Sequence, residues 1–215
     1  MPAEASAMFD PACRRCERLA TFLDTIREQY PDYHAAPVPS FGPLEVPLLI
    51  VGLAPGMHGA NATGRPFTGD YAGVLLYESL YLHGFATRPE SVSADDGLEL
   101  VDCRITNAVK CLPPQNKPTT AEVRTCNGYL AAEIEAMRPR VLLALGKVAH
   151  DAVLRARNLP LSAHPFAHGA EHELDGGLRL IDSYHCSRYN TQTRRLTPEM
   201  FHALFVRIRE HLGKD

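Results

Sequence analysis

The sequence predicts an α/β fold: a single domain with a central four-stranded, mostly parallel sheet flanked by helices on both faces. Short runs of apolar residues alternate along the chain with segments in which apolar residues recur at helical spacing. The 215 residues, 45% of them hydrophobic, are enough for one well-buried domain and few for two. Because the sequence contains neither an internal repeat nor a long linker, we expect one domain over residues 1–215.

Four apolar runs predict the strands of this sheet. Each run is short and is followed by glycine or a polar residue, as is typical of a buried strand that ends in a loop. The strands are expected at residues 48–51, 103–109, 141–145 and 178–181. In parallel sheets, ligands bind beyond the carboxyl ends of the strands. The segments that follow these runs are therefore the first candidates for a functional site.

Helical periodicity predicts the segments around the strands. The spacing of apolar positions over residues 19–26 indicates an early helix that ends near Pro31. Two further helices are expected over residues 120–138 and after Gly146.

Two other helices carry recognisable start signals. The helix that follows Asp70 is expected to bury Val74, Leu75, Leu80 and Leu82. The last helix begins after Thr197, an N-cap residue that proline follows, and runs to about residue 212. Its inner face is expected to consist of Phe201, Leu204, Phe205 and Ile208.

Composition and charge restrict the class of protein. No stretch of about 18 apolar residues is present, so we expect no membrane-spanning helix. Residues 1–10 lack the basic and apolar regions of a signal peptide, and we expect a cytoplasmic, reducing location. The net charge of −3 gives no support to DNA binding, which normally depends on basic residues that neutralise phosphates. A small net charge can hide a local basic surface, for which Arg188, Arg194 and Arg195 are candidates.

Four of the six cysteines have the arrangement of a metal site. Cys13 and Cys16 form a C-x2-C pair, and Cys111 and Cys126 lie in a loop and in the helix that follows it. Four thiolates suit either a structural zinc ion or a [4Fe–4S] cluster. The wider second pair is unlike an ordinary zinc ribbon. The alternative is that Cys111 and Cys126 are merely buried thiols.

The other two cysteines have less to indicate a function. Cys103 alternates with Ile105 in a strand and is expected to pack in the core. Cys186 follows His185 directly, so a Cys–His nucleophile is conceivable. Adjacent residues in an extended segment point in opposite directions, which argues against such a pair.

Two glycine-rich loops follow the first strand. Residues 52–56 let the backbone approach a ligand closely, but they do not match the dinucleotide-binding pattern. Residues 64–70 place Phe67 between glycines and a proline, which offers a rigid stacking surface. Asp70 is either a base or the N-cap of the next helix, and its spacing alone favours the N-cap.

Polar residues end two other strands. Asn107 has a carboxamide that both donates and accepts hydrogen bonds, as the recognition of a nucleobase edge requires. His185 ends the fourth strand and can act as a hydrogen-bond donor. The alternatives are an asparagine that satisfies a turn and a histidine that satisfies a loop.

Taken together, five segments resemble motifs of the uracil-DNA glycosylase superfamily and occur in the order of that family. They are residues 52–56, 64–69, 105–111, 139–146 and 185–190. With the four cysteines they cover the chain from residue 13 to about residue 197. The resemblance implies the family's fold and its reaction, hydrolysis of the N-glycosidic bond of uracil in DNA at the start of base excision repair.

The cysteines are placed as in families four and five of this superfamily, where the corresponding four bind a [4Fe–4S] cluster. The resemblance therefore implies that a cluster ties the N-terminal segment to the domain through Cys13, Cys16, Cys111 and Cys126. Other branches carry an acid or an amide where this chain has Leu53 and Ala54. That difference, with Asp70 downstream and the long segment 190–197, is most like family five (type B). Cys186 departs from the family pattern, since many relatives have proline there.

The resemblance also implies roles for single residues. Phe67 would stack on the base, Asn107 would bind its edge and His185 would donate to the oxygen that gains charge. Asp70 would orient water or stabilise the sugar cation, because Leu53 and Ala54 are chemically inert. The implied base-binding residues are Gly52, Ala54, Phe67, Asn107 and His185.

The implied partner is DNA that contains uracil or another deaminated base, such as hypoxanthine or xanthine, bound by a monomer associated with the nucleoid. DNA contacts are expected from Ser187, Arg188, Tyr189, Asn190, Arg194 and Arg195. Tyr189 or Asn190 would fill the space that the flipped base leaves. The alternative is a non-catalytic iron–sulfur or zinc protein that binds nucleic acid on the same fold. Such a protein would not need Asp70 and His185. An electron-transfer protein would leave the set of Phe67, Asn107 and His185 unexplained.

Overall fold

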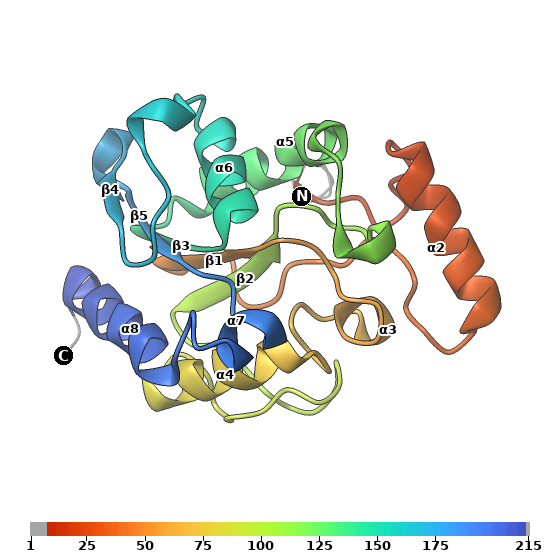
Figure 1. Cartoon of the computed structure of the whole chain (residues 1–215), viewed down its shortest axis with the longest axis horizontal. Coiled ribbons are helices and arrows are strands. Elements are labelled where there is room, and N and C mark those ends of the chain that lie inside the picture. The colour runs from red at the N-terminus through yellow and green to blue at the C-terminus, as the bar shows by residue number, and fades with distance from the viewer. Residues whose placement is uncertain (1–7, 214–215) are drawn as a thin grey trace.

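A five-stranded sheet runs through the centre of the computed structural model, which describes residues 8–213 (Figure 1). The strand order is β2-β1-β3-β5-β4, and only β4 is antiparallel to its neighbour. The strands are β1 (Leu48–Gly52), β2 (Cys103–Asn107), β3 (Val141–Leu145), β4 (Glu171–Glu173) and β5 (Arg179–Ser183). The predicted α/β class is confirmed, with five strands in place of the expected four. The ends of the expected domain, residues 1–7 and 214–215, lie outside the described part.

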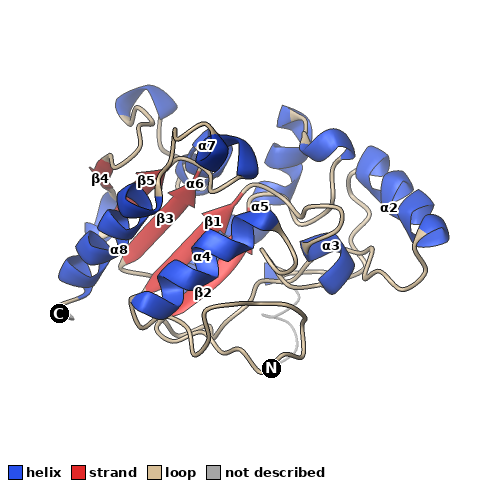
Figure 2. Ribbon diagram, turned by 60° about the horizontal axis from the view of Figure 1, so that its bottom comes forward, coloured by secondary structure: helices blue, strands red, loops and turns tan. Residues whose placement is uncertain are grey.

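Helices cover both faces of the sheet, as predicted. They are α2 (Glu17–Gln29), α3 (Ala60–Thr63), α4 (Tyr71–Leu82), α5 (Thr120–Met137), α6 (Lys147–Ala156), α7 (Arg188–Gln192) and α8 (Pro198–Leu212). Helices α4 and α8 lie on one face, and α5 and α6 lie on the other (Figure 2). Within the described residues, no helix is long and apolar enough to cross a membrane.

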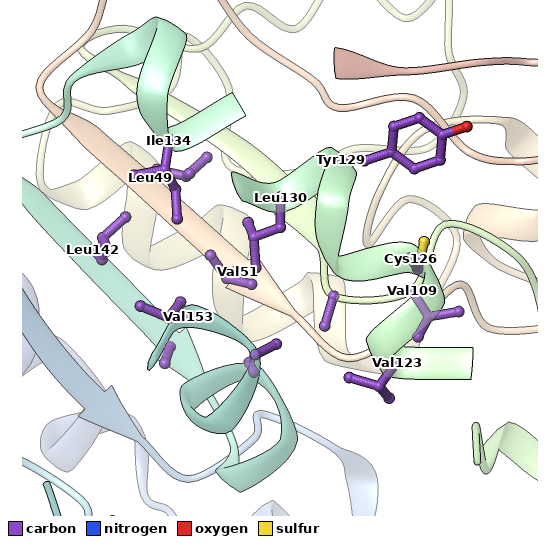
Figure 3. Close-up of a cluster of buried hydrophobic side chains, with 14 of the residues drawn as sticks. Leu49, Val51, Val109, Val123, Cys126, Tyr129, Leu130, Ile134, Leu142 and Val153 are labelled. Atoms are coloured by element: carbon purple, nitrogen blue, oxygen red, sulfur yellow. The ribbon is translucent and has the colours of Figure 1, made fainter. Parts of the chain in front are cut away.

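The central strands are buried because each face of the sheet packs against a helical layer. In β1, Leu49 and Val51 face α5 and α6, where they join a cluster that includes Leu130 and Val153 (Figure 3). The alternate residues of the strand, such as Ile50, face the layer of α4 and α8. Two-sided burial explains why the strands appear in the sequence as continuous apolar runs rather than as alternating patterns.

Local signals explain where the long helices begin. Thr119 and Glu122 form a capping box at the start of α5: each side chain accepts a hydrogen bond from the other residue's backbone N–H. Thr197 accepts from the backbone N–H of Met200 at 3.3 Å, and Pro198 begins α8, as predicted. The expected inner face of α8 is fully buried.

The expected apolar face of α4 is partly wrong. Leu75 and Leu80 are buried, but Val74 is 62% exposed and Leu82 is 60% exposed. This helix has apolar residues on all sides, so periodicity did not distinguish its inner face. Contacts with the sheet and with α8 bury Tyr77 instead of Val74.

Three short elements lie in segments for which the sequence predicts neither a helix nor a strand. Strand β4 contains only Glu171, His172 and Glu173, and its pairing with β5 defines it. Helices α3 and α7 have four and five residues. Strand β2 ends at Asn107, two residues before its expected end. That end brings Asn107 to the same edge of the sheet as the carboxyl ends of β1, β3 and β5.

Candidate active site

A cavity of about 490 Å³ opens beyond the carboxyl ends of the parallel strands. The segments that follow β1, β2, β3 and β5 each contribute to its walls. It is lined by Leu53, Ala54, Gly56, Phe67, Asp70, Tyr71, Ala72, Asn107, Asn116, Leu145, Gly146, Lys147, Val148, His185, Ser187 and Arg188. The structure therefore brings together Phe67, Asp70, Asn107 and His185, which the sequence singles out in three separate segments.

Gly52, the last residue of β1, makes room for two of these side chains. A Cβ at position 52 would overlap with Asn107 Oδ1 and would lie 2.7 Å from the ring of Phe67. Phe67 adopts a left-handed backbone conformation with φ of 57°, which turns its ring into the cavity wall. Gly52 is thus expected to contribute to the site by leaving room for the side chains of Asn107 and Phe67.

Asn107 presents an unsatisfied acceptor to the cavity. Its side chain is buried, and its Oδ1 accepts no hydrogen bond from any described residue. A buried acceptor without a partner costs about 1–3 kcal/mol. Such a cost points to a ligand that supplies the missing donor.

His185 lines the cavity, and its ring is stacked near that of Phe67. The ring centroids are 6.0 Å apart with an interplanar angle of 28°. Burial lowers the pKa of His185 to about 4, so the imidazole is neutral near pH 7. The Asn190 side chain donates to the His185 carbonyl at 2.8 Å. Asn190 therefore holds the backbone of His185 in place.

Asp70 occupies the N-cap position of α4, but its side chain makes no capping hydrogen bond. The capping interpretation that spacing favours is therefore wrong. The carboxylate instead turns toward Gly56 and Gly59 and accepts from the backbone N–H of Ala60 at 3.3 Å. A Cβ on Gly56 would lie 2.5 Å from Asp70 Oδ1. Burial raises the pKa of Asp70, while the Ala60 N–H lowers it.

Leu53 and Ala54 line the cavity without offering a polar side chain. Backbone hydrogen bonds hold this loop against the end of β2: Val109 N–H donates to the Leu53 carbonyl at 3.0 Å. Asp70 is consequently the one carboxylate among the described residues that line the cavity. The glycines that seat it were missed as site residues, although the G-x-x-G spacing of Gly56 and Gly59 was visible in the sequence.

The four predicted metal-binding cysteines line a second, smaller cavity. Cys13 and Cys16 precede α2, Cys111 follows β2, and Cys126 lies in α5 beside Val109 (Figure 3). Burial, together with the charges of the other three sulfurs, raises the pKa of the Cys111 thiol to about 12. The Lys110 backbone N–H donates to Cys126 Sγ at 3.3 Å. A cationic metal centre would offset the mutual repulsion of four thiolates.

The remaining cysteines lie apart from both cavities. Cys103 is fully buried in the core, as predicted. Cys186 is also fully buried, and burial raises the pKa of its thiol to about 12. A shielded, neutral thiol is a poor nucleophile, which disfavours the Cys–His alternative.

Comparisons with known proteins agree with this geometry. Residues 39–209 match the family model described as the uracil DNA glycosylase superfamily. A Thermus thermophilus protein named type-5 uracil-DNA glycosylase is 45% identical over 99% of this chain and 100% of its own length. A Pyrobaculum aerophilum protein of the same name is 44% identical over 87% of this chain and 83% of its own. An Archaeoglobus fulgidus protein named type-4 uracil-DNA glycosylase is 31% identical over 94% of this chain and 89% of its own.

The chain belongs to the uracil-DNA glycosylase superfamily. Its higher identity to the type-5 relatives than to the type-4 relative confirms the predicted resemblance to family five. The inert pair Leu53 and Ala54 and the carboxylate of Asp70 are the features of this chain on which that prediction depended.

The rim of this superfamily member's cavity combines aromatic and basic side chains. The Arg188 guanidinium lies 4.9 Å above the ring of Tyr71, and both residues line the cavity. Outside the lining, Arg195 lies 4.5 Å above the ring of Tyr184. Tyr189 is 70% exposed at the start of α7. Ser187 caps this short helix by accepting from the Asn190 N–H at 3.5 Å. The aromatic rim residue Tyr71 was missed, and its only sequence signal is its position next to Asp70.

Proposed function

We propose that this protein is a monofunctional DNA glycosylase that hydrolyses the N-glycosidic bond of uracil in DNA. The observation that carries the proposal is the gathering of Phe67, Asp70, Asn107 and His185 in one cavity. An aromatic surface, an unpaired amide oxygen, a neutral imidazole and a carboxylate are the groups that base release requires. The names of the relatives add independent support.

Recognition of the base is assigned to Asn107 and Phe67. Uracil carries an N–H at ring position 3 between two carbonyl groups, so its edge offers one donor and two acceptors. Asn107 Oδ1 has no partner among the described residues and is placed to accept from this N–H. Cytosine lacks a hydrogen at that ring nitrogen and would leave the buried acceptor unpaired.

Stabilisation of the leaving group is assigned to His185. When the glycosidic bond breaks, the base departs as an anion whose charge is shared with its carbonyl oxygens. A neutral imidazole has one ring N–H, which can donate a hydrogen bond to such an oxygen. Burial keeps the pKa of His185 at about 4, which maintains the neutral form. Donors aimed at developing charge are usually the largest catalytic contribution.

Asp70 is assigned to the other product of bond cleavage, the sugar with oxocarbenium character. Its carboxylate would stabilise this cation and orient the water that attacks it. Neither Leu53 nor Ala54 can take this part, because both have hydrocarbon side chains. The small residues Ala54 and Gly56 also leave room for purines, so we include hypoxanthine and xanthine among the substrates.

The cysteine set fits a [4Fe–4S] cluster, because four thiols from three segments converge on one cavity with a backbone N–H directed at one sulfur. Cys13, Cys16, Cys111 and Cys126 would hold it. The cluster would supply a structural cross-link in that position. The chain already reinforces this junction, since Arg18 of α2 pairs with Glu122 of α5 at 2.7 Å. The two cavities share no lining residue within the described chain.

Contacts with DNA are assigned to α7 and the segment that follows it. Arg188, Arg194 and Arg195 would bind phosphates around the cavity mouth. Exposed Tyr189 is the better candidate to replace the flipped base in the duplex, because Asn190 is bonded to the His185 carbonyl.

The test uses purified protein and a labelled duplex that contains a single uracil. Treatment with alkali after incubation converts each abasic site to a strand break. Breaks with the wild type that are lost in both Asp70→Asn and His185→Ala, while DNA affinity persists, support the proposal. Hypoxanthine and xanthine duplexes then test its range. No breaks with any of these bases, together with intact DNA binding, would instead favour the non-catalytic binding protein.

A further inference from the structure

A buried cluster of His150, His172 and Asp182 lies outside both cavities. One ligand atom from each residue lies within 4.8 Å of the others. His150 Nδ1 is 2.7 Å from Asp182 Oδ1, and His172 Nε2 is 3.2 Å from Asp182 Oδ2. Asp182 is fully buried and His150 is 1% exposed. The assignments of base recognition, water activation and cluster binding leave these residues unused.

The hydrogen bonds of His150 fix the positions of its protons. Its Nε2 lies 2.9 Å from the backbone carbonyl of His164, which can only accept, so Nε2 carries a hydrogen. A neutral His150 therefore presents the lone pair of Nδ1 to the carboxylate of Asp182. Two acceptors at 2.7 Å repel each other unless a proton or a metal ion lies between them. This orientation, with the second ring nitrogen bonded to a carbonyl, is that of a metal-binding histidine.

Rigid elements carry all three side chains. His150 lies in α6, His172 in β4 and Asp182 in β5, and β5 and β4 are the last two strands at one edge of the sheet (Figure 1). The backbone of Asp182 is fixed on both sides, since its N–H donates to Ala170 and its carbonyl accepts from Gly169. The ring of Phe166 packs against the ring of His150, with 5.5 Å between the ring centroids. A site built on helices and strands holds its geometry better than a site on loops.

We propose that His150 Nδ1, His172 Nε2 and Asp182 form a binding site for a divalent transition metal ion, with zinc as the best fit. Imidazole and carboxylate are zinc ligands with bonds of about 2.0–2.2 Å. Tetrahedral ligands at that length lie about 3.3 Å from one another. The three ligand atoms lie within 4.8 Å of one another, and the two histidine nitrogens lie 2.7 Å and 3.2 Å from the two oxygens of Asp182, so side-chain rotations would bring them to this geometry. The His164 ring, 5.5 Å from the His172 ring, or a water completes the coordination.

The site is independent of the proposed glycosylase activity. A bound ion would link β4, β5 and α6. Because it binds the folded protein, it raises the temperature of unfolding.

The test is a titration of the full-length protein, with its iron–sulfur cluster assembled, with zinc chloride in a calorimeter. The variant is His172→Gln, because His172 is the most exposed of the three. The matched control is His168→Gln, a neighbouring histidine whose ring instead accepts from the Tyr184 N–H at 3.2 Å. Unchanged visible absorption of the cluster shows that the cysteines are not the zinc ligands.

We expect one zinc ion per chain in the wild type and in His168→Gln, with a raised unfolding temperature. We expect at least a ~tenfold loss of affinity in His172→Gln. The same is expected of Asp182→Asn if its circular dichroism matches that of the wild type. Equal zinc binding by the wild type and His172→Gln, or no zinc binding by the wild type, would overturn the proposal.

Discussion

The carboxyl group of Asp70 occupies the space that a side chain on Gly59 would fill. A Cβ built at position 59 would overlap with the carboxyl carbon and with both of its oxygens. Gly56 contributes similarly, since its Cβ would lie 2.5 Å from Asp70 Oδ1. The carboxylate therefore rests against bare backbone, and two glycines define its position as firmly as any hydrogen bond.

We expect Gly59→Ala to reduce uracil release about 100-fold, because displacing a reacting group by an ångström has an effect of this order. Single-turnover cleavage of the uracil duplex measures the rate. Gly128→Ala is the matched control, since nothing lies within 4 Å of a Cβ there. It should leave the rate unchanged. A wild-type rate in Gly59→Ala would remove Asp70 from the reaction.

Replacement of His58 should move the acidic limb of the pH–rate profile. Burial raises the pKa of Asp70, and positive charge on His58 lowers it. In His58→Gln that lowering is lost, so the pKa of Asp70 rises and activity disappears at a higher pH as the solution is acidified. Tyr33→Phe is the control, because it removes only the hydroxyl that lies 2.8 Å from His58 Nδ1. A limb that does not move in His58→Gln would contradict the role of the Asp70 carboxylate.

Asn107→Ala should separate activity from stability. Loss of the amide removes the contact to the base edge and reduces uracil release by about 100-fold or more. The substitution also removes a buried acceptor that has no partner among the described residues, so the free energy of unfolding should stay the same or increase. Chemical denaturation and the cleavage assay measure the two effects. A large loss of stability would show that Asn107 is a structural residue.

His185 should make the fold sensitive to mild acid. Its pKa is about 4 in the folded protein, well below the ordinary histidine value near 6.5. The unfolded chain therefore binds this proton more readily, and stability falls as pH decreases from 6.5 toward 4. The residue should contribute a loss of roughly 2 kcal/mol between pH 7 and pH 5. Denaturation curves at both pH values should show a smaller loss for His185→Gln than for the wild type.

Cys16→Ser should remove the visible absorption of the proposed iron–sulfur cluster and lower the unfolding temperature. The reason is that the cluster would join the N-terminal segment to α5 and to the loop after β2. Cys103→Ser is the matched control, because Cys103 lies outside the cysteine cavity and its thiol donates to the Phe85 carbonyl at 3.4 Å, a bond that serine retains. Retained cluster absorption in Cys16→Ser would exclude Cys16 as a ligand.

The sequence was sufficient to predict the elements that the core defines. The strand Val141–Leu145 is buried on both faces, so its composition alone indicates it. Strand β4 has a polar sequence, and only its partner β5 makes it a strand. The inner face of α4 was likewise beyond prediction from periodicity, because its apolar residues surround the helix and tertiary packing selects among them.

The candidate active site was likewise predictable only in part from the sequence. Phe67, Asn107 and His185 follow or end strands, and parallel topology brings such positions to one edge. Asp70 was harder to interpret, because a carboxylate before a helix has the sequence pattern of a cap. What distinguishes Asp70 is that its carboxylate occupies the space that Cβ atoms on Gly56 and Gly59 would need. This arrangement depends on how the chain between the two glycines and Asp70 folds back.

The two margins of the sheet are closed in different ways. Beside β2, Phe41 exchanges two backbone hydrogen bonds of 2.8 Å with Ile105, so a loop covers that margin. At the opposite margin, β4 is three residues long, and Glu171 is held by Arg207 at 3.0 Å and by His211 at 2.8 Å. Short, charged or covered margins give a foreign strand little to pair with. The protein should consequently resist edge-to-edge aggregation at the concentrations that purification and storage require.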